Sequence, residues 1–445
     1  MPPPSNRPDQ SPASPEAGAT VDQWLAYLEA IHPTEIDLGL DRVLLVLRRL
    51  FRRTPDARII TVAGTNGKGS TVAAVEALLR AAGRRTGAYT SPHLQRYNER
   101  VRLNGEDISD DALIRAFEAV EVARGNVSLT YFEFGTLAAF VAFADAGLDN
   151  WILEVGLGGR LDAVNALDAD FAILTSVDID HVAFLGDNRE VIGFEKAGVL
   201  RRGIPAVYGD TDPPGSVLQQ AAAQKVQLAM VGRDYELVTD PRPASGFPAV
   251  KLRYHEQTIR LPAGPLPVKS VAAAVVAVRQ LEPDLPVTVI EKVLSGLGLP
   301  GRFERLGSSP DIFLDVGHNP HAAGWLAGQL NSLKLPGRRI HAVYGALGDK
   351  DVEGVGRAMI DVVDAWYPAS LKVPRGLSGQ DLQARLASAE IANAPAFGSV
   401  DEALNSALAA TALTDLVVVF GSFYTVAEAR QILLADKSTG GGKPS

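Results

Sequence analysis

The clearest chemical signal is a glycine-rich stretch in which the mostly apolar residues 59–63 lead into a turn with one lysine. Its residues are Gly64, Thr65, Asn66, Gly67, Lys68, Gly69, Ser70 and Thr71. Glycines let backbone N–H groups turn inward around phosphate oxygens, and the following helix N-terminus adds a positive partial charge. Lys68 can reach the β- and γ-phosphates, while Ser70 or Thr71 can approach a phosphate or its Mg²⁺. The stretch predicts binding of a nucleoside triphosphate; the alternative is a strand-to-helix turn with a solvated lysine.

Two further sets of side chains could act on a ligand. Glu154 follows the apolar run that starts at Trp151, so it would end a parallel strand at the edge where open α/β sheets bind ligands. A carboxylate there suits Mg²⁺, which prefers oxygen ligands, but it could also be a surface charge ahead of a glycine-rich turn. Tyr131 and Phe132 could flank a flat aromatic ring or pack into the core where a helix begins.

The elements that must position these residues form an alternating series. Short β-branched runs predict strands at Ala57–Val62, Trp151–Val155 and Phe171–Thr175, and helical patterns occupy Lys68–Ala82 and Phe134–Asp145. Because the apolar runs lack strict alternation, they are typical of parallel strands covered on both faces. The series predicts a doubly wound α/β sheet.

A second series follows a Gly/Pro-rich segment near residue 300. It predicts strands at Asp311–Val316, His341–Tyr344, Asp364–Tyr367 and Leu416–Phe420, with helices between them. Before that segment, Asp234–Leu261 combines polar alternation with prolines, which favours a peripheral antiparallel excursion. The chain therefore has the pattern of two α/β units.

We expect the chain to divide into two domains and two tails. The larger domain, at 20–298, would hold the nucleotide loop and a mostly parallel sheet, and a smaller Rossmann-like α/β domain would occupy 299–436. Residues 1–19 and 437–445 are expected to be disordered, because proline, glycine and small polar residues cannot bury enough surface to offset the entropy of ordering.

Composition narrows the classes of function. The chain has 445 residues, 46% of them hydrophobic and 21% charged, the balance of an ordinary soluble globular protein. A net charge of -9 argues against a general nucleic-acid binder, and the lack of cysteine excludes disulfides, thiolate nucleophiles and cysteine-ligated metals. No apolar run approaches the roughly 18–20 residues of a membrane span, and no signal-peptide pattern is present. We expect a cytoplasmic protein without nucleic-acid or membrane partners.

An ordered series of motifs resembles one enzyme family. The loop GTNGKGS at 64–70 resembles that of the Mur ligase superfamily, and specifically of bifunctional folylpolyglutamate synthase/dihydrofolate synthase. The resemblance extends from Ile36 to Ala427. Its other motifs are IDLGLDRV (36–43), YTSPHL (89–94), ER (99–100), LEVGLGGRLDA (153–163), DIDH (178–181), EKAG (195–198), GRF (301–303), DVGHNP (315–320), GDKD (348–351) and GSF (421–423). One such string could be chance, whereas the ordered series is a specific match.

The resemblance implies an ATP-dependent ligase that forms an amide bond. A carboxylate is a poor electrophile at neutral pH, so it is first phosphorylated to an acyl phosphate, which an amine then attacks. The implied substrates are L-glutamate, 7,8-dihydropteroate and tetrahydrofolates that already carry glutamate, and the implied state is a monomer. Catalysis would be mainly positioning and charge neutralisation.

The resemblance also assigns nucleotide and metal residues. ATP contacts fall on the loop 64–71, Ser270, Arg302 and Asp315, and the catalytic set is Lys68, Lys196 and His181. The Mg²⁺ ligands would be Ser91, Glu154, His181 and Lys196, with the lysine carbamylated by CO₂ to hold a second ion. Two residues depart from the family pattern: Ser270 stands near the usual adenine-contacting Asn, and Phe194 stands where relatives often have a polar or basic residue.

The pterin substrate is assigned to three segments by the same resemblance. They comprise Asp37, Leu38 and Gly39, then Thr130, Tyr131, Phe132 and Glu133, and finally Leu161, Asp162 and Ala163.

Several of these residues also have ordinary structural interpretations. Imidazole is not a favoured Mg²⁺ donor, so His181 alone would be a core or loop histidine. Lys196 lies in a helical stretch, Val191–Val199, where a lysine is usually solvated or ion-paired. Ser91 alone would be a turn residue, and DVGHNP could be a capped turn with Asn319 as N-cap.

Two other functions fit parts of the sequence. Cell-wall ligases of the same superfamily have a preceding UDP-binding domain of order a hundred residues, but only 63 residues precede Gly64. A P-loop regulatory ATPase would hydrolyse ATP as a conformational signal. The chain has no guanine-reading Asn-Lys-x-Asp string, and a second α/β domain with its own motifs favours a ligase.

Overall fold

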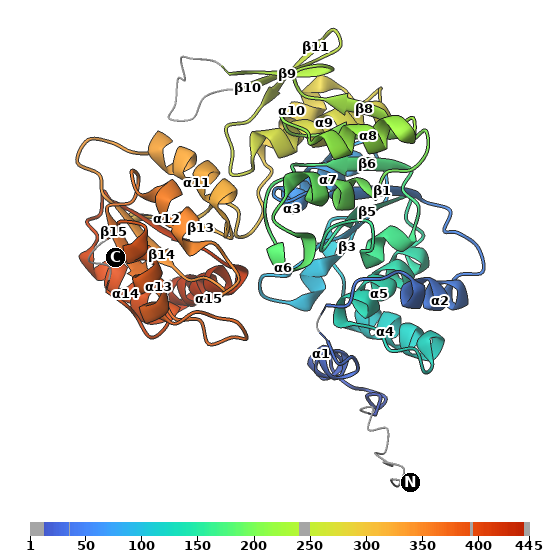
Figure 1. Ribbon diagram of the computed structural model, residues 1–445, viewed down its shortest axis with the longest axis horizontal. Helices are drawn as coiled ribbons and strands as arrows, with labels where there is room; N and C mark the ends of the chain where they lie inside the picture. Colours follow the sequence, from blue (N-terminus) through green and yellow to red (C-terminus); the bar gives the residue numbers. More distant parts are fainter. Residues whose placement is uncertain (1–12, 35, 240–249, 392–394, 440–445) are drawn as a thin grey trace.

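The protein folds into two α/β units, seen side by side in the computed structural model (Figure 1). The structure describes residues 13–34, 36–239, 250–391 and 395–439, with side chains to residue 435. In Figure 1 the larger unit runs from blue to yellow and the smaller one from orange to red. The prediction of an α/β fold with two such units is confirmed.

The larger unit is built on an eight-stranded sheet in the order β4-β3-β2-β5-β1-β6-β7-β8. Six strands are parallel, and two short antiparallel ones, β3 and β4, form an edge. The strands are β1 (Arg58–Ala63), β2 (Thr86–Tyr89), β3 (Val101–Leu103), β4 (Glu106–Asp107), β5 (Asn150–Glu154), β6 (Phe171–Leu174), β7 (Pro205–Tyr208) and β8 (Gln227–Met230).

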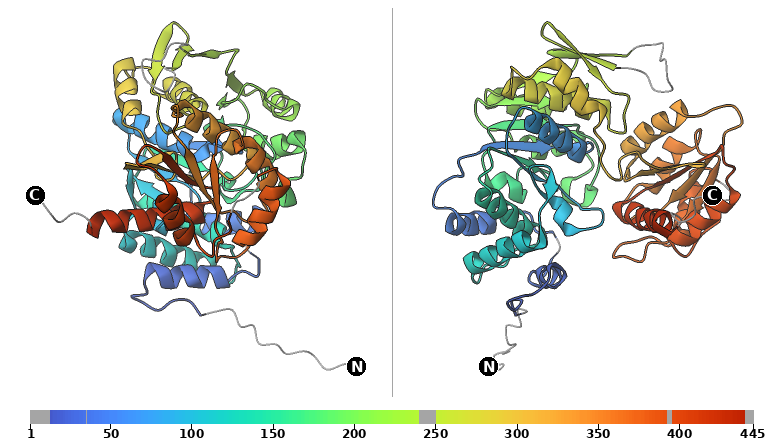
Figure 2. Two further views of the ribbon diagram at one scale, coloured as in Figure 1. Left: turned by 90° about the vertical axis from the view of Figure 1, so that its left-hand side faces the viewer. Right: turned by 180° about the vertical axis from the view of Figure 1, so that it is seen from behind.

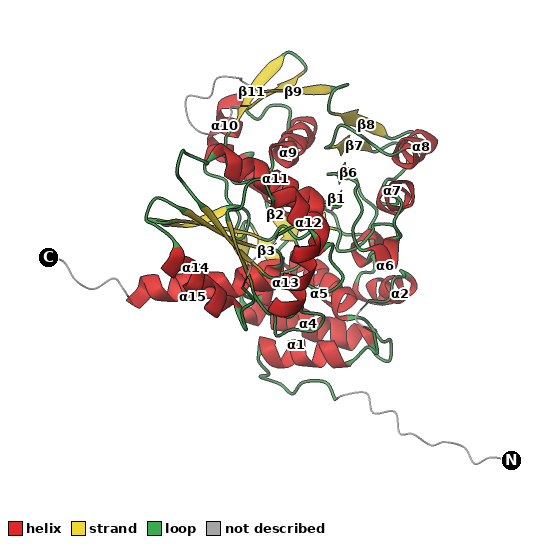
Figure 3. Ribbon diagram, turned by 60° about the vertical axis from the view of Figure 1, so that its left-hand side comes forward, coloured by secondary structure: helices red, strands yellow, loops and turns green. Residues whose placement is uncertain are grey.

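Helices bury both faces of this sheet, which explains the unbroken apolar runs. One face is covered by α3 (Lys68–Ala81), α9 (Val268–Leu281) and α10 (Val287–Ser295). The core on the other face includes residues of α1 (Val21–Ala30), α2 (Asp41–Leu50), α4 (Asp110–Arg124), α5 (Tyr131–Asp145), α7 (Arg189–Ala197) and α8 (Gly215–Ala223). Successive strand residues point to opposite faces, so Ile59 belongs to one core and Ile60 to the other. Figure 3 shows the helices on either side of the strands.

Helix α5 starts earlier than the predicted Phe134. It begins at Tyr131 because Thr130 caps it: the Thr130 hydroxyl accepts from Glu133 N–H, and the Glu133 carboxylate accepts from Thr130 N–H. Two 3₁₀ turns, η1 (Tyr97–Arg100) and η2 (Ala163–Ala166), and the short α6 (Val182–Leu185) complete this unit.

The expected antiparallel excursion is present beyond α9 and α10. Strands β9 (Tyr235–Thr239), β10 (Val250–Tyr254) and β11 (Gln257–Leu261) form a three-stranded sheet. It packs apolar side chains such as Leu252 and Ile259 onto the core of α9. Residues 240–249 of the predicted excursion lie outside the described residues.

The smaller unit has a five-stranded sheet in the order β12-β13-β16-β14-β15. Only β12 is antiparallel. Helices α11 to α13 cover one face and α14 and α15 the other (Figure 2). The elements are β12 (Glu304–Ser308), β13 (Asp311–Asp315), α11 (Pro320–Ser332), β14 (Ile340–Tyr344), α12 (Val352–Met359), β15 (Ala365–Pro368), α13 (Gly379–Ser388), α14 (Val400–Ala410), β16 (Leu416–Phe420) and α15 (Phe423–Thr439).

The ends of the chain differ in part from expectation. Helix α15 continues to Thr439, three residues into the segment predicted as a tail, and 440–445 lie outside the described residues. Residues 1–12 also lie outside them, and 13–19 contain no helix or strand. We keep the domain boundary at 298/299 as a proposal; it falls between α10 and β12. None of the described helices has the length and apolar character needed to cross a membrane.

Candidate active site

The candidate site lies where three neighbouring parallel strands end. The glycine-rich loop follows β1, Glu154 ends β5, and Thr175 follows β6. The pairing register places Val62 opposite Glu154, and Ala63 opposite Leu174. Three segments that are far apart in sequence therefore meet at the carboxyl edge of the sheet, where open α/β folds bind ligands.

The loop between β1 and α3 depends on two of its glycines. Gly64 and Gly67 have φ angles of 149° and 81°, which disfavour side chains. A Cβ on Gly64 would lie 1.9 Å from Thr175 Oγ1, and one on Gly67 would lie 2.2 Å from Ser270 Oγ. Ser270, from α9, thus stands against the turn that starts α3. At both positions the positive φ and the close side-chain oxygen favour glycine.

A segment after β6 holds the loop in place, and its residues Thr175 and Ser176 were not among the predicted site residues. Thr175 Oγ1 donates to the Asn66 carbonyl at 2.7 Å, and Thr65 N–H donates to the Ser176 carbonyl at 2.8 Å. Thr65 Oγ1 in turn donates to the Asp178 carbonyl at 3.0 Å. The available signal was the position of these polar residues just beyond a buried strand next to β1.

Two lysines converge on one carbonyl of the loop. Lys68 Nζ donates to the Gly64 and Thr65 carbonyls at 3.1 and 3.2 Å, and Lys196 Nζ donates to the Gly64 carbonyl at 3.0 Å. Lys196 lies on α7 and is buried, so the interpretation of a solvated or ion-paired lysine is wrong. Burial, helped by the nearby Lys68, lowers the pKa of Lys196 to about 7.

Glu154 lies next to the first turn of α3. Its carboxylate accepts from Ser91 N–H at 3.2 Å, and a Cβ on Gly69 would lie 3.7 Å from Glu154 Oε2 and 3.8 Å from an Arg302 nitrogen. Only 4% of Glu154 is exposed, which rules out the surface-charge interpretation. Burial raises the pKa of Glu154, against the lowering effect of Lys68 and Arg302. A buried carboxylate whose pKa is still raised in these surroundings is suited to binding a cation.

The two hydroxyls of that turn differ. Thr71 Oγ1 donates to the Gly67 carbonyl at 3.0 Å, whereas Ser70 Oγ is buried without a hydrogen-bond partner among the described residues. A buried polar atom without a partner is rare in folded proteins and often marks a ligand position. Ser70 is therefore the hydroxyl available to a phosphate or a metal ion.

The smaller unit contributes Arg302 and Asp315. Arg302 is stacked on the Phe423 ring, 4.9 Å from its centroid, and Asp315 accepts from Phe303 N–H and Gly317 N–H at 2.9 and 2.8 Å. Burial raises the pKa of Asp315 in spite of Arg302. A cavity of about 570 Å³ opens beside Arg302, between residues 298–300 of the Gly/Pro-rich segment and residues 263–265. As predicted, Asn319 caps α11, with Pro320 at its first position.

His181 and Asp180 end the loop that follows β6. His181 is exposed and has a left-handed φ of 52° where α6 begins. Burial alone would raise the pKa of Asp180, but His318, Lys350 and His181 outweigh it and hold that pKa well below its ordinary value. Among the described residues, no three His, Asp or Glu side chains form a metal-binding group. A metal here would depend on hydroxyl or modified-lysine ligands as well.

The three segments assigned to the pterin lie together. Arg42 donates to both carboxylate oxygens of Glu133, at 3.3 and 2.9 Å, and to Asp37 Oδ2 at 2.7 Å. Turn η2, which begins at Ala163, packs against both α2 and α5. Asp162 accepts from Leu157 N–H and Val164 N–H, and burial raises its pKa to about 6.

The two aromatic residues of this region are neither free nor fully in the core. Phe132 is half-buried, and a Cβ on Gly156 would lie 2.7 Å from its ring. Tyr131 packs edge-on against Tyr97, and the Arg100 guanidinium lies 5.5 Å from the Tyr131 ring centroid. Burial raises the pKa of Tyr131 well above its ordinary value, so its hydroxyl stays protonated at neutral pH. Because Phe132 is only half-buried, part of its side chain remains accessible to a ligand.

Substitution of Arg42 tests whether these segments work as a unit. We expect Arg42→Gln to raise the KM for a pterin substrate about tenfold, because it removes charge-assisted bonds worth about 1.5–3 kcal/mol that join Asp37 to Glu133. Binding of ADP, measured by calorimetry, should stay the same, since Arg42 lies away from the nucleotide loop. If ADP binding weakened by a factor similar to the rise in KM, the result would indicate a general loss of structure instead.

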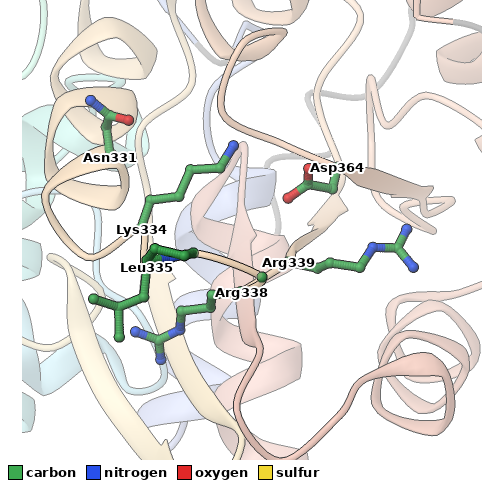
Figure 4. A pocket seen from close by; sticks show the side chains of 8 residues that line it. Asn331, Lys334, Leu335, Arg338, Arg339 and Asp364 are labelled. Carbon is green, nitrogen blue, oxygen red and sulfur yellow. The ribbon is translucent and has the colours of Figure 1, made fainter.

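A separate hollow of about 590 Å³ lies at the other edge of the small sheet, before β14 and β15 (Figure 4). Lys334, Arg338, Arg339 and Asp364 line it. It opens at the amino ends of the strands and is not part of the candidate site.

Comparison with known proteins identifies the family. The Mur ligase middle domain matches residues 62–237, and the Mur ligase glutamate ligase domain matches residues 301–423. The dihydrofolate synthase/folylpolyglutamate synthase of Escherichia coli (strain K12) is 42% identical over 428 residues, which cover 96% of this chain and 99% of that protein. This chain belongs to the dihydrofolate synthase/folylpolyglutamate synthase family. The resemblance noted in the sequence is confirmed.

Other family members agree with this assignment. The Haemophilus influenzae enzyme is 40% identical over 93% of this chain and 97% of its own length. A structure of E. coli FolC in complex with DHPP and ADP superposes with a TM-score of 0.89, at 41% identity over 95% of this chain and all of that one. A Yersinia pestis family member complexed with AMPPNP and a Mn ion gives 0.87, with the same identity and coverage. The family fold is thus shared along nearly the whole chain.

Proposed function

We propose that this protein is an ATP-dependent ligase that joins L-glutamate to 7,8-dihydropteroate and to tetrahydrofolates already carrying glutamate. The observation that carries the proposal is the meeting of Gly69, Glu154 and Arg302, from the loop, β5 and the smaller unit, at the carboxyl edge of three strands. The dihydrofolate synthase/folylpolyglutamate synthase relatives support the choice of substrates.

Charge neutralisation is the main task of the nucleotide residues. Lys68 now donates to carbonyls of its own loop, and its flexible ammonium can turn to the β- and γ-phosphates when ATP enters. Arg302 would add a second cation from the smaller unit, and Asp315 would contact the nucleotide from the end of β13. The backbone N–H groups of the first turn of α3 supply further donors to the phosphates.

The donors around Glu154 fit a magnesium ion. A buried carboxylate, the partnerless Ser70 hydroxyl and the nearby Ser91 are oxygen ligands of the kind Mg²⁺ prefers. When bound, the ion would neutralise phosphate charge during transfer to the substrate carboxylate. Glu154 would keep its charge because a neighbouring cation favours the ionised carboxylate and opposes the effect of burial on its pKa.

We assign a second ion to Lys196 and His181. An amine is not a magnesium ligand, but a carbamate formed from Lys196 and CO₂ presents oxygens. Only the neutral amine can react with CO₂, and a pKa of about 7 leaves a large neutral fraction at physiological pH. The protein would act as a monomer on small-molecule substrates, with the pterin held between α2, α5 and η2.

An ADP-release assay tests this function. We expect release that needs ATP, Mg²⁺, L-glutamate and an acceptor together, with dihydropteroate and tetrahydrofolate compared as acceptors. The substrates must all be present because an acyl phosphate turns over productively only when an amine can attack it. Release that stays constant without glutamate and acceptor would instead identify a regulatory ATPase, and reactions that lack one component each are the controls.

A further inference from the structure

One carboxylate of the larger unit is surrounded by donors from the smaller unit. Asp180 Oδ1 accepts from Lys350 Nζ at 2.8 Å, and Asp180 Oδ2 accepts from Asn319 Nδ2 at 3.1 Å. His318 Nε2 lies 3.5 Å from the same oxygen. Asp180 precedes α6, whereas the three donors come from the segments before α11 and α12. The contact therefore joins two units with separate cores.

The partner lysine is also buried. The side chains of Lys350 and Asp180 are only 8% and 10% exposed. The other carboxylate near Lys350, that of Asp349, is 3.8 Å away, more exposed, and shared with Arg375. Asp180 is therefore the main counter-ion of Lys350. A buried ammonium that loses its main carboxylate partner is strongly unfavourable, so the pair favours the docked arrangement.

The same donors reach the nucleotide loop. Asn319 Nδ2 also donates to Asn66 Oδ1 at 3.0 Å, and Asn66 Nδ2 donates back to Asn319 Oδ1 at 3.3 Å. Asn319 thus bridges Asp180 and Asn66, while Thr65 is tied to Asp178. The loop that grips phosphate and the loop that ends in His181 are held by one turn of the smaller unit.

We propose that Asp180 and Lys350 form a latch that docks the smaller unit onto the nucleotide loop and so brings Arg302 and Asp315 to the reacting phosphate. Both are positioning residues rather than catalytic ones. They contact each other, and they would act on the reacting phosphate only through the placement of Arg302 and Asp315. The latch rests on the proposed function for its effect on turnover, but not for its effect on the distance between the units.

A distance measurement tests docking directly. The chain has no cysteine, so Val122→Cys and Leu413→Cys, at exposed positions of the larger and smaller unit, would give the only two labelling sites. We expect one narrow spin–spin distance distribution with ADP and Mg²⁺, and a broadened or longer one after Lys350→Met. The matched control is Lys334→Met, which should leave the distribution narrow. Lys334 is an exposed lysine of the smaller unit and lines the separate hollow before β14. An unchanged distribution in Lys350→Met would overturn the proposal.

Kinetics separate the latch from general loss of structure. We expect Lys350→Met to lower kcat about tenfold or more, in the range of typical coupling between sites, with a KM for dihydropteroate within about twofold of the parent. Lys350→Arg, which keeps the charge, should recover most of kcat. Asp180→Asn combined with Lys350→Met should be no slower than either alone. If kcat fell in Asp180→Asn but not in Lys350→Met, the latch would be overturned, and the result would point to a role of Asp180 beside His181.

The two proposals fail differently. If the protein proved not to be a ligase, ADP release would lack its dependence on acceptor and glutamate, while the label distances would still report docking. If the latch were wrong, substrate-dependent ADP release would remain, and the distances would not respond to Lys350→Met.

Discussion

Lys68→Met is expected to lower substrate-dependent ADP release about 10²–10³-fold, the usual cost of removing one preorganised donor from developing charge. The Lys68 ammonium is the one loop cation placed by the first turn of α3, and in the described residues it is held only by carbonyls of its own loop. Methionine keeps the length and apolar stem of the side chain without the charge. The measurement is ADP release at saturating ATP, dihydropteroate and glutamate.

Its control is a lysine of the same unit with no part in the site. Lys292, exposed on α10, should tolerate the same change with little effect on rate. Both variants should melt at about the parent temperature, since neither side chain is a core residue. A Lys68→Met enzyme of near-normal turnover would remove this lysine from phosphate neutralisation and weaken the nucleotide assignment with it.

Lys196→Met should lower turnover about a hundredfold or more, because it removes the proposed carbamate ligand and with it several kcal/mol of charge stabilisation. The same measurement of ADP release applies. Addition of bicarbonate should raise the rate of the parent in CO₂-depleted buffer and leave the variant unchanged. Equal response of both enzymes, or normal turnover of the variant, would exclude a carbamate on Lys196.

The pH dependence of this residue follows from its lowered pKa. The ammonium dominates below about pH 7 and cannot react with CO₂, so activity should rise as pH increases through 7. A rate that is flat from about pH 6 to about pH 8 in saturating bicarbonate would contradict this explanation.

The burial of Lys196 also affects the stability expected of Lys196→Met. The pKa of Lys196 is lowered from 10.5 to about 7, so the unfolded chain binds more protons between these values. The cost of burying the lysine is therefore full below about pH 7 and declines as pH rises toward 10.5. Methionine avoids that cost, and we expect an equal or higher melting temperature at pH 6 by calorimetry. Lys196→Met can thus keep its fold. The reason is that an apolar side chain replaces a buried charge, and not that Lys196 is solvated.

The sequence determined the local chemistry of this protein. Apolar runs without alternation predicted the parallel strands. The carboxyl ends of those strands indicated the glycine-rich loop, Glu154 and Asp315 as site residues. Asn319 and Pro320 predicted the start of α11, because capping depends only on neighbouring backbone groups. These features rest on interactions within a few residues, so their signals are contiguous in the chain.

Tertiary structure alone decided the surroundings of those residues. Whether Lys196 is solvated or buried depends on α7 packing beside the loop that follows β1, more than a hundred residues earlier. The support of the loop by Thr175 and the pairing of Asp180 with Lys350 likewise join distant segments. Burial, and the pKa values that follow from it, are set by which elements pack together, and that is a property of the whole fold.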